Sequence, residues 1–185
     1  MLMKFSFTSF HPKSLASFAL MLAAANVAQS QSRLDEDFDD EYKPWQEIAL
    51  QLPSAPQAAN LLPFYVSATA TQSFAIDAKS LTVGSDGVIR YTLVSASPGG
   101  AKNISYEGIR CGAFEKKIYA IGQPDGSWSR SRRNQWERIA QNASNRQHAI
   151  LAKDYFCQSL TVAGDAKQMI ERIRWQQPLT QQLGE

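Results

Sequence analysis

Apolar and polar side chains alternate along short segments in the middle of the chain, as in strands with one buried face. The clearest segment is SLTVGSDGVIRYTLVSAS, in which two β-rich runs flank residues 84–87. Asp86-Gly87 supplies the positive φ that tight hairpins require. In the second run, one face receives Ile89, Tyr91 and Leu93, and the other receives Arg90 and Thr92. This segment predicts an antiparallel hairpin whose second strand is half-buried.

Further β-rich runs lie before and after this hairpin. They cover residues 64–66, 74–76, 81–83, 104–111 and 114–121. Glycine-containing turns at residues 97–100 and 122–126 separate the later runs. Turns at such regular intervals predict an antiparallel meander.

The apolar period changes to that of a helix in the last third of the chain. Helical spacing relates Trp136, Ile139, Ala140 and Ala143, then Leu151 with Tyr155 and Ala152 with Phe156, and finally Met169, Ile170 and Ile173. Asp165 and Gln168 have the spacing of a capping box before the last stripe. A short helical turn is also expected from Pro44 to Ala49. Strands followed by helices predict an α+β fold, in which an antiparallel meander is followed by helices packed on one face.

The N-terminal residues follow the order of a secretory signal peptide. Lys4 and Lys13 precede an apolar run from Leu15 to Val27, and the small-residue exit Ala28-Gln29-Ser30 follows. We therefore expect residues 1–30 to be a signal peptide cleaved near Ser30. The run is about 13 residues long, and a membrane-spanning helix needs roughly 20, so no stable membrane span is expected. A retained anchor is the alternative, whereas lipid attachment is excluded because no cysteine lies near the cleavage point.

Export would place the two cysteines, Cys111 and Cys157, in an oxidising compartment. We expect them to form one disulfide, which would contribute about 4 kcal/mol in the chain-entropy model. Two separate buried thiols are the alternative.

Charge divides the mature chain into two parts. Residues 31–43 contain the acidic stretch DEDFDDE, which we interpret as a flexible solvated segment, because it lacks the fixed oxygen spacing and the glycine of a calcium loop. Residues 44–185 then form a single domain. Loss of Lys4 and Lys13 reduces the 19 basic residues to 17, which equals the number of acidic residues. A neutral mature chain argues against a nucleic-acid partner.

Three segments resemble the cryptic neisserial protein family, a group of exported bacterial proteins without an assigned activity. They are SLTVGSDGVIRYTLVSASPGGAKNISYEGIRC, YAIGQPDGSW and HAILAKDYFC, and the resemblance extends from about Trp45 to Cys157. It implies a bacterial periplasmic protein. The lipoprotein character often expected in this family does not carry over, since the signal lacks the required cysteine. The resemblance supplies no catalytic residues.

Reactive groups do not form a recognisable catalytic motif. His148 is the one histidine left after cleavage, and Asp154, six residues later, is not on the same helical face. We therefore interpret His148 as a surface or capping residue, with a general base as the alternative. The sequence contains no nucleophile elbow, phosphate-binding loop or zinc-protease helix, so we expect no cofactor and no metal site.

Two groups of residues are candidates for binding. Tyr106, Glu107 and Arg110 lie on the strand that leads into Cys111, where Glu107 could line a polar pocket or serve as a structural carboxylate paired with an arginine. The second group consists of Arg130, Arg132 and Arg133, which lie between two tryptophans and could bind phosphate, carboxylate or an anionic polymer. The alternative for these arginines is a solvated loop that begins a helix.

Two functional hypotheses follow. The first is a non-enzymatic periplasmic module that binds another envelope protein or an anionic envelope polymer, because turn and core residues account for the best-defined segments. The second is a periplasmic hydrolase that uses Glu107 with a second carboxylate such as Asp154. The second requires titratable groups that meet in a concave site.

Overall fold

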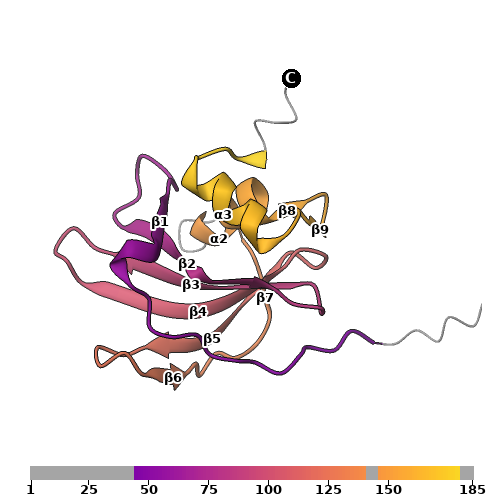
Figure 1. The fold of residues 1–185 in the computed structure, drawn as a ribbon, viewed down its shortest axis with the longest axis horizontal. Helices are drawn as coiled ribbons and strands as arrows, with labels where there is room; N and C mark the ends of the chain where they lie inside the picture. Colours follow the sequence, from indigo (N-terminus) through magenta and orange to yellow (C-terminus); the bar gives the residue numbers. More distant parts are fainter. Residues whose placement is uncertain (1–43, 141–145, 180–185) are drawn as a thin grey trace, which may run out of the picture. The chain divides into compact units, whose positions relative to one another are not determined.

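The computed structural model describes residues 44–140 and 146–179, so the expected signal peptide and acidic segment lie outside the described residues. The main sheet is antiparallel, and its strands follow one another in sequence order, with β7 also pairing to β5 (Figure 1). The strands are β1 (Leu61–Phe64), β2 (Ser73–Val83), β3 (Val88–Ala96), β4 (Lys102–Arg110), β5 (Glu115–Gly122), β6 (Trp128–Arg130) and β7 (Glu137–Arg138). The predicted meander is confirmed. A 3-10 turn, η1 (Ala58–Asn60), precedes β1.

The hairpin between β2 and β3 forms at the predicted place. Gly87 has a φ of 74°, and the Gly84 N–H donates to the Val88 carbonyl at 2.9 Å. The register of β2 and β3 shifts between Asp77 and Thr82. Within that irregular stretch the Ser80 hydroxyl accepts the Thr92 N–H at 2.8 Å, so a side chain replaces a missing ladder partner.

The helices follow the sheet in the chain and cover one of its faces (Figure 1). They are α2 (Arg146–Ile150), the π-helix η3 (Leu151–Phe156) and α3 (Ala166–Arg174), with a two-stranded ribbon of β8 (Cys157–Gln158) and β9 (Thr161–Val162) between them. The Asp165 side chain accepts the Gln168 N–H at 2.8 Å, and the Gln168 side chain accepts the Asp165 N–H in return. The predicted capping box and the α+β class are therefore confirmed.

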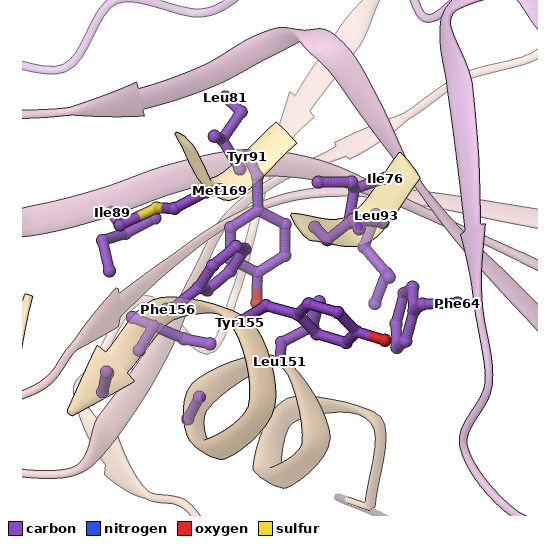
Figure 2. Close-up of a cluster of buried hydrophobic side chains, with 14 of the residues drawn as sticks. Phe64, Ile76, Leu81, Ile89, Tyr91, Leu93, Leu151, Tyr155, Phe156 and Met169 are labelled. Carbon is purple, nitrogen blue, oxygen red and sulfur yellow. The ribbon is translucent and has the colours of Figure 1, made fainter. Parts of the chain in front are cut away.

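The main core lies between this face of the sheet and the helices (Figure 2). The predicted facing of β3 holds, because Ile89, Tyr91 and Leu93 all join this core. The prediction that β3 is half-buried is wrong, because Arg90 and Thr92 on its other face are 4 % and 0 % exposed. The Tyr91 ring lies 5.3 Å from the ring of Phe156, measured between centroids. Each fully buried side chain of this size contributes about 1.5–3 kcal/mol to folding, so the helices are fixed to the sheet mainly by apolar burial.

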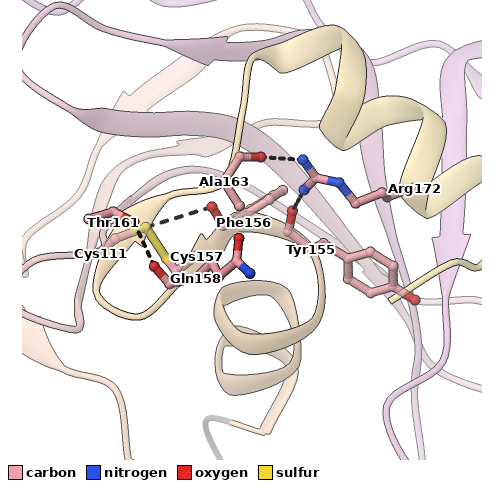
Figure 3. The surroundings of a disulfide bond; sticks show 8 residues. All are labelled: Cys111, Tyr155, Phe156, Cys157, Gln158, Thr161, Ala163 and Arg172. Carbon is pink, nitrogen blue, oxygen red and sulfur yellow. Dashed lines mark hydrogen bonds between the residues drawn. A yellow bond between two sulfur atoms is a disulfide. The ribbon is translucent and has the colours of Figure 1, made fainter. Parts of the chain in front are cut away.

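A disulfide joins the end of the sheet to the helical region (Figure 3). Cys111 follows β4 and Cys157 begins β8, and their Cα atoms are 5.6 Å apart. The expected pairing is confirmed. Beside it, the Arg172 guanidinium of α3 donates to the carbonyls of Tyr155 and Ala163, so α3 is tied to both sides of the β8–β9 ribbon.

Two helical predictions are wrong. Residues 44–49 form no helix, because the Trp45 indole N–H and the Ile48 backbone N–H both bond to Asp86 in the β2–β3 turn. Residues 136–140 contain β7 instead of a helix; residues 141–145, the rest of the predicted segment, lie outside the described residues. Trp136 packs on Tyr119 whereas Ile139 joins the main core, so the apolar pair serves both faces of the sheet.

In the part of the chain that the structure describes, none of the helices has both the length and the apolar character that crossing a membrane requires.

Candidate functional site

The face of the main sheet opposite the helices, called the outer face below, carries aromatic and charged side chains. Trp45, Trp136, Tyr119, Tyr106 and Trp128 form a chain of ring contacts across it. Successive ring centroids in that chain are 6.0, 6.3, 5.9 and 6.1 Å apart. Cations are interleaved with the rings: Lys117 lies 5.1 Å from the Tyr119 centroid and Arg90 lies 5.7 Å from it. The outer face is therefore a second, partly polar core.

Residues 45–53, called the strap, cross the outer face without forming a helix or a strand (Figure 1). Asp86 holds one end, where its backbone carbonyl accepts the Trp45 indole N–H at 2.8 Å and its carboxylate accepts the Ile48 N–H at 3.1 Å. Trp128 holds the other end by donating its indole N–H to the Pro53 carbonyl at 2.8 Å. The strap is thus fixed at both ends by tertiary hydrogen bonds.

Glu47 fastens the strap to the sheet electrostatically. Its carboxylate accepts from Lys117 at 2.8 Å and from the Tyr119 hydroxyl at 2.5 Å, and Arg90 lies 3.6 Å away. Partial burial by itself would raise the pKa of Glu47, but the hydrogen bonds and charges of these partners lower it below its ordinary value. Burial and the bond to Glu47 raise the pKa of Tyr119, which therefore stays protonated as a donor.

A groove runs between the strap and the β5–β6 hairpin, with a volume of about 460 Å³, and is called the strap groove. Its aliphatic wall comes from Ile48, Leu50 and Leu52 of the strap. These three side chains are 42 %, 39 % and 48 % exposed, which is unusual for aliphatic residues on one segment. The opposite wall carries Trp128, Lys117 and Arg130, so the groove combines apolar surface with positive charge.

A second groove of about 460 Å³ lies on the other side of the strap, against β2 and β3. Its lining includes Ser80, Thr82, Tyr106 and the two cations Lys79 and Arg90. The Arg90 guanidinium is held in place by Asp86, at 2.6 Å between Nη2 and Oδ2. Burial would raise the pKa of the Asp86 carboxyl, but the hydrogen bonds from Arg90, Ile48 and Val88 bring it below its ordinary value.

The predicted binding residues separate into two groups. Tyr106 and Arg110 lie on the outer face, where Tyr106 is buried and the Arg110 guanidinium stacks 4.2 Å from the Trp45 ring centroid and pairs with Glu115 at 2.5 Å. Arg130 lines the strap groove.

The other two arginines, Arg132 and Arg133, are exposed on the segment that follows β6. Among the described residues, none of Arg130, Arg132 and Arg133 has an ion-pair partner. The next described element after them is the strand β7 and not a helix, so the expectation that this loop begins a helix is wrong.

Glu107 lies on the helix-facing side, away from Tyr106, as strand alternation predicted. Its carboxylate accepts from Ser105 at 2.6 Å and from Tyr91 at 3.2 Å, and it lies 2.8 Å from Nε2 of His148 in α2. Burial alone would raise the pKa of Glu107, yet the charge and hydrogen bond of His148, with the Ser105 hydroxyl, lower it.

This arrangement corrects two expectations. His148 is 4 % exposed and forms a buried pair, so it is not a surface or capping residue. The partner of Glu107 is this histidine and not an arginine, because Arg110 points to the outer face and pairs with Glu115. The structure thus brings together Glu107 and His148, which the sequence left 41 residues apart. Asp154, the second carboxylate considered, lies in η3.

The strap was not predicted from the sequence, and Glu47, Leu50 and Lys117 were not identified as residues that line a groove. Alternation of Ile48, Leu50 and Leu52 with Ala49 and Gln51 was the available signal, since an apolar residue at every second position is typical of extended backbone. A short helix was predicted instead, because Pro44 suits the first position of a helix. As for metals, residues 44–140 and 146–179 contain no group of three or more His, Cys, Asp or Glu side chains that could hold an ion.

Comparison with known proteins gives one match. The model of the CNP1-like family matches residues 40–174. No curated protein and no solved structure matches the chain. The family match includes the strap and all the described strands and helices, so both grooves belong to the matched region. The neisserial origin that the sequence suggested stays a prediction, because the family match does not test it.

Proposed function

Because the chain belongs to the CNP1-like family, whose function is unknown, we propose from its own surface that it is an exported, non-enzymatic binding module of the bacterial periplasm. Its ligand lies in the strap groove and carries negative charge. The observation that supports this most is the strap groove itself, in which exposed aliphatic side chains face Trp128 and Arg130, and Arg130 has no ion-pair partner among the described residues.

Charge in and near the groove favours an anionic ligand. Glu47 is the one acidic side chain in the lining, and it is already engaged by Lys117 and Tyr119. Arg130 has no such partner in the described part of the chain, and Arg132 and Arg133 follow it closely in sequence. A guanidinium beside an aromatic ring is well suited to carboxylate or phosphate, because it can donate two parallel hydrogen bonds.

A binding role fits the position of the titratable groups better than the hydrolase alternative does. Glu107, on which that alternative relies, is 2 % exposed and its carboxylate already accepts from three side chains. A general acid or base must come within hydrogen-bonding distance of its substrate. Substrate could reach this carboxylate only if α2 moved away from the sheet.

Export is proposed from the signal-like residues 1–30, and the disulfide supports it. Structural disulfides are characteristic of oxidising compartments and rare in the cytosol. The Cys111–Cys157 bond is buried at both ends, at 1 % and 9 % exposure, as expected of a structural bond and not of a reactive thiol pair.

The binding role is tested by replacing Arg130, Arg132 and Arg133 together with serine. The mature protein and the variant are passed over an immobilised acidic polysaccharide, in buffer of low and of high salt concentration. We expect retention of the parent protein and a loss of about tenfold or more in the variant, because three cations are removed. Replacement of Lys102, Lys153 and Lys167 with serine removes the same charge elsewhere and serves as the control. Equal retention of all three proteins would refute a site at the groove.

A further inference from the structure

The strap contains backbone groups that nothing else in the described chain uses. Its ends are bonded to Asp86 and Trp128, but Ala49, Leu50, Gln51 and Leu52 make no backbone hydrogen bond with any described residue. All four residues are exposed. An accessible stretch of unpaired N–H and C=O groups is the feature by which a sheet edge recruits another chain.

Both sides of this stretch are open, since one groove lies on each side of the strap. Leu50 lines the strap groove, Ala49 and Gln51 line the other groove, and Ile48 and Leu52 border both. The strap is held at both ends before any ligand arrives. Little conformational entropy would therefore be lost when a second chain pairs with it.

The side chains around the strap groove indicate what such a chain must carry. Apolar residues would meet Leu50, Leu52 and Trp128, and acidic residues would meet Arg130. In an extended peptide these two kinds of residue can alternate and point to opposite sides. An acidic polysaccharide could satisfy Arg130, but it lacks the regular series of N–H and C=O groups that the strap backbone can pair with.

We propose that residues 49–52 of the strap are a docking edge for an extended acidic segment of a partner protein, which adds to the strap as a strand and directs side chains over the strap groove. This rests on the proposed function, because it names the class of ligand for the same groove. The partner's backbone supplies the hydrogen bonds, its apolar side chains cover the exposed leucines, and its carboxylates pair with Arg130.

The test uses a soluble peptide of about eight residues, a common strand length, in which aspartate and valine alternate. Two further peptides of the same sequence carry N-methyl groups on alternate amides, one on the odd positions and one on the even positions. Strand addition uses the amides of one peptide edge only. Binding of each peptide to the mature protein is measured by calorimetry. We expect one methylated peptide to lose about tenfold or more in affinity, the equivalent of one or two hydrogen bonds, and the other to bind as the parent does.

Variants of the protein give an independent readout. Gln51→Pro removes a backbone donor from an exposed residue, and Gln51→Ala is the matched control that keeps it. Leu50→Pro, with Leu50→Ala as control, removes a donor from the opposite edge of an extended strap. We expect one proline variant to lose peptide binding relative to its alanine control, while thermal unfolding shows that both still fold.

Other outcomes would overturn this inference. If both methylated peptides bind as tightly as the parent peptide, the side chains alone make the contact. If no peptide binds but the acidic polysaccharide binds in an Arg130-dependent way, the proposed function stands and the docking edge does not. A concentration-dependent dimer that Gln51→Pro or Leu50→Pro dissociates would assign the edge to a second copy of the chain.

Discussion

The buried pair of Glu107 and His148 allows the sharpest prediction about stability. His148→Ala would leave a carboxylate that is 2 % exposed with only two hydroxyl donors, those of Ser105 and Tyr91. Removing one partner of a buried ion pair costs about 3–5 kcal/mol, because the remaining charge is neither solvated nor paired. In a domain of this size, each kcal/mol shifts the melting temperature by roughly 2–4 °C. We therefore expect His148→Ala to lower it by roughly 6–20 °C.

The assay is a double-mutant cycle by urea unfolding, with His148→Ala, Glu107→Gln and the double variant. The double variant should be less destabilised than the sum of the two single variants, since Glu107→Gln removes the charge that His148→Ala leaves unpaired. Glu171→Gln is the control. It breaks the pair between Glu171 and Arg174, whose side chains are 43 % and 44 % exposed, and should cost less than about 1 kcal/mol.

The pH dependence of the same variants checks the electrostatic origin. The pKa of Glu107 is lowered in the folded protein, so its contribution to stability is complete above the unfolded value of about 4.3 and is lost as the pH falls below it. Glu107→Gln should therefore show a shallower loss of stability on acidification than the parent protein. Additive single-variant costs, together with an unchanged acid profile, would refute a coupled ionic pair in the core.

Three further predictions concern other parts of the domain. Replacing Cys111 and Cys157 with serine should lower the free energy of unfolding by about 4 kcal/mol, measured in urea, because the bond closes a long loop; an unchanged unfolding midpoint would contradict this. Glu47→Gln should destabilise the strap by about 1–2 kcal/mol at neutral pH and by less in acid, where the lowered pKa of Glu47 is crossed and the parent loses the same interaction. Hydrogen exchange of the Ile48 amide reports this, and equal protection at both pH values would count against it. Asp165→Ala should cost about 1 kcal/mol by removing the cap of α3, whereas Asp165→Asn should cost little, and thermal melting compares the two.

Local sequence was sufficient wherever a short-range preference and the hydrophobic pattern agreed. The hairpin around Gly87, the capping box at Asp165 and the facing of the β3 side chains all formed as predicted, because the residues that decide each feature are neighbours in the chain. The cysteine pair was predictable for a different reason, since only two cysteines were present.

Contacts between distant segments decided the rest. The residues from Trp45 to Ala49 are compatible with a helical turn. Hydrogen bonds from Trp45 and Ile48 to Asp86, which is 41 and 38 residues away in the sequence, hold this segment as a strap instead. His148 pairs with Glu107 across a sequence separation of 41 residues, and the sequence around either residue does not indicate that the other is its partner. The strap groove likewise combines residues from the strap, β5 and β6.

The sequence by itself determined that a meander of strands precedes the helices, that the two cysteines pair, and which residues of β3 face the helices. Only the tertiary structure decided that the segment before the first strand lies over the outer face, that its central backbone is left unpaired, and that the one histidine of the described region is sealed in the core. The physical reason is that secondary structure follows from neighbouring residues, whereas a groove and a buried ion pair exist only once remote side chains share the same desolvated space.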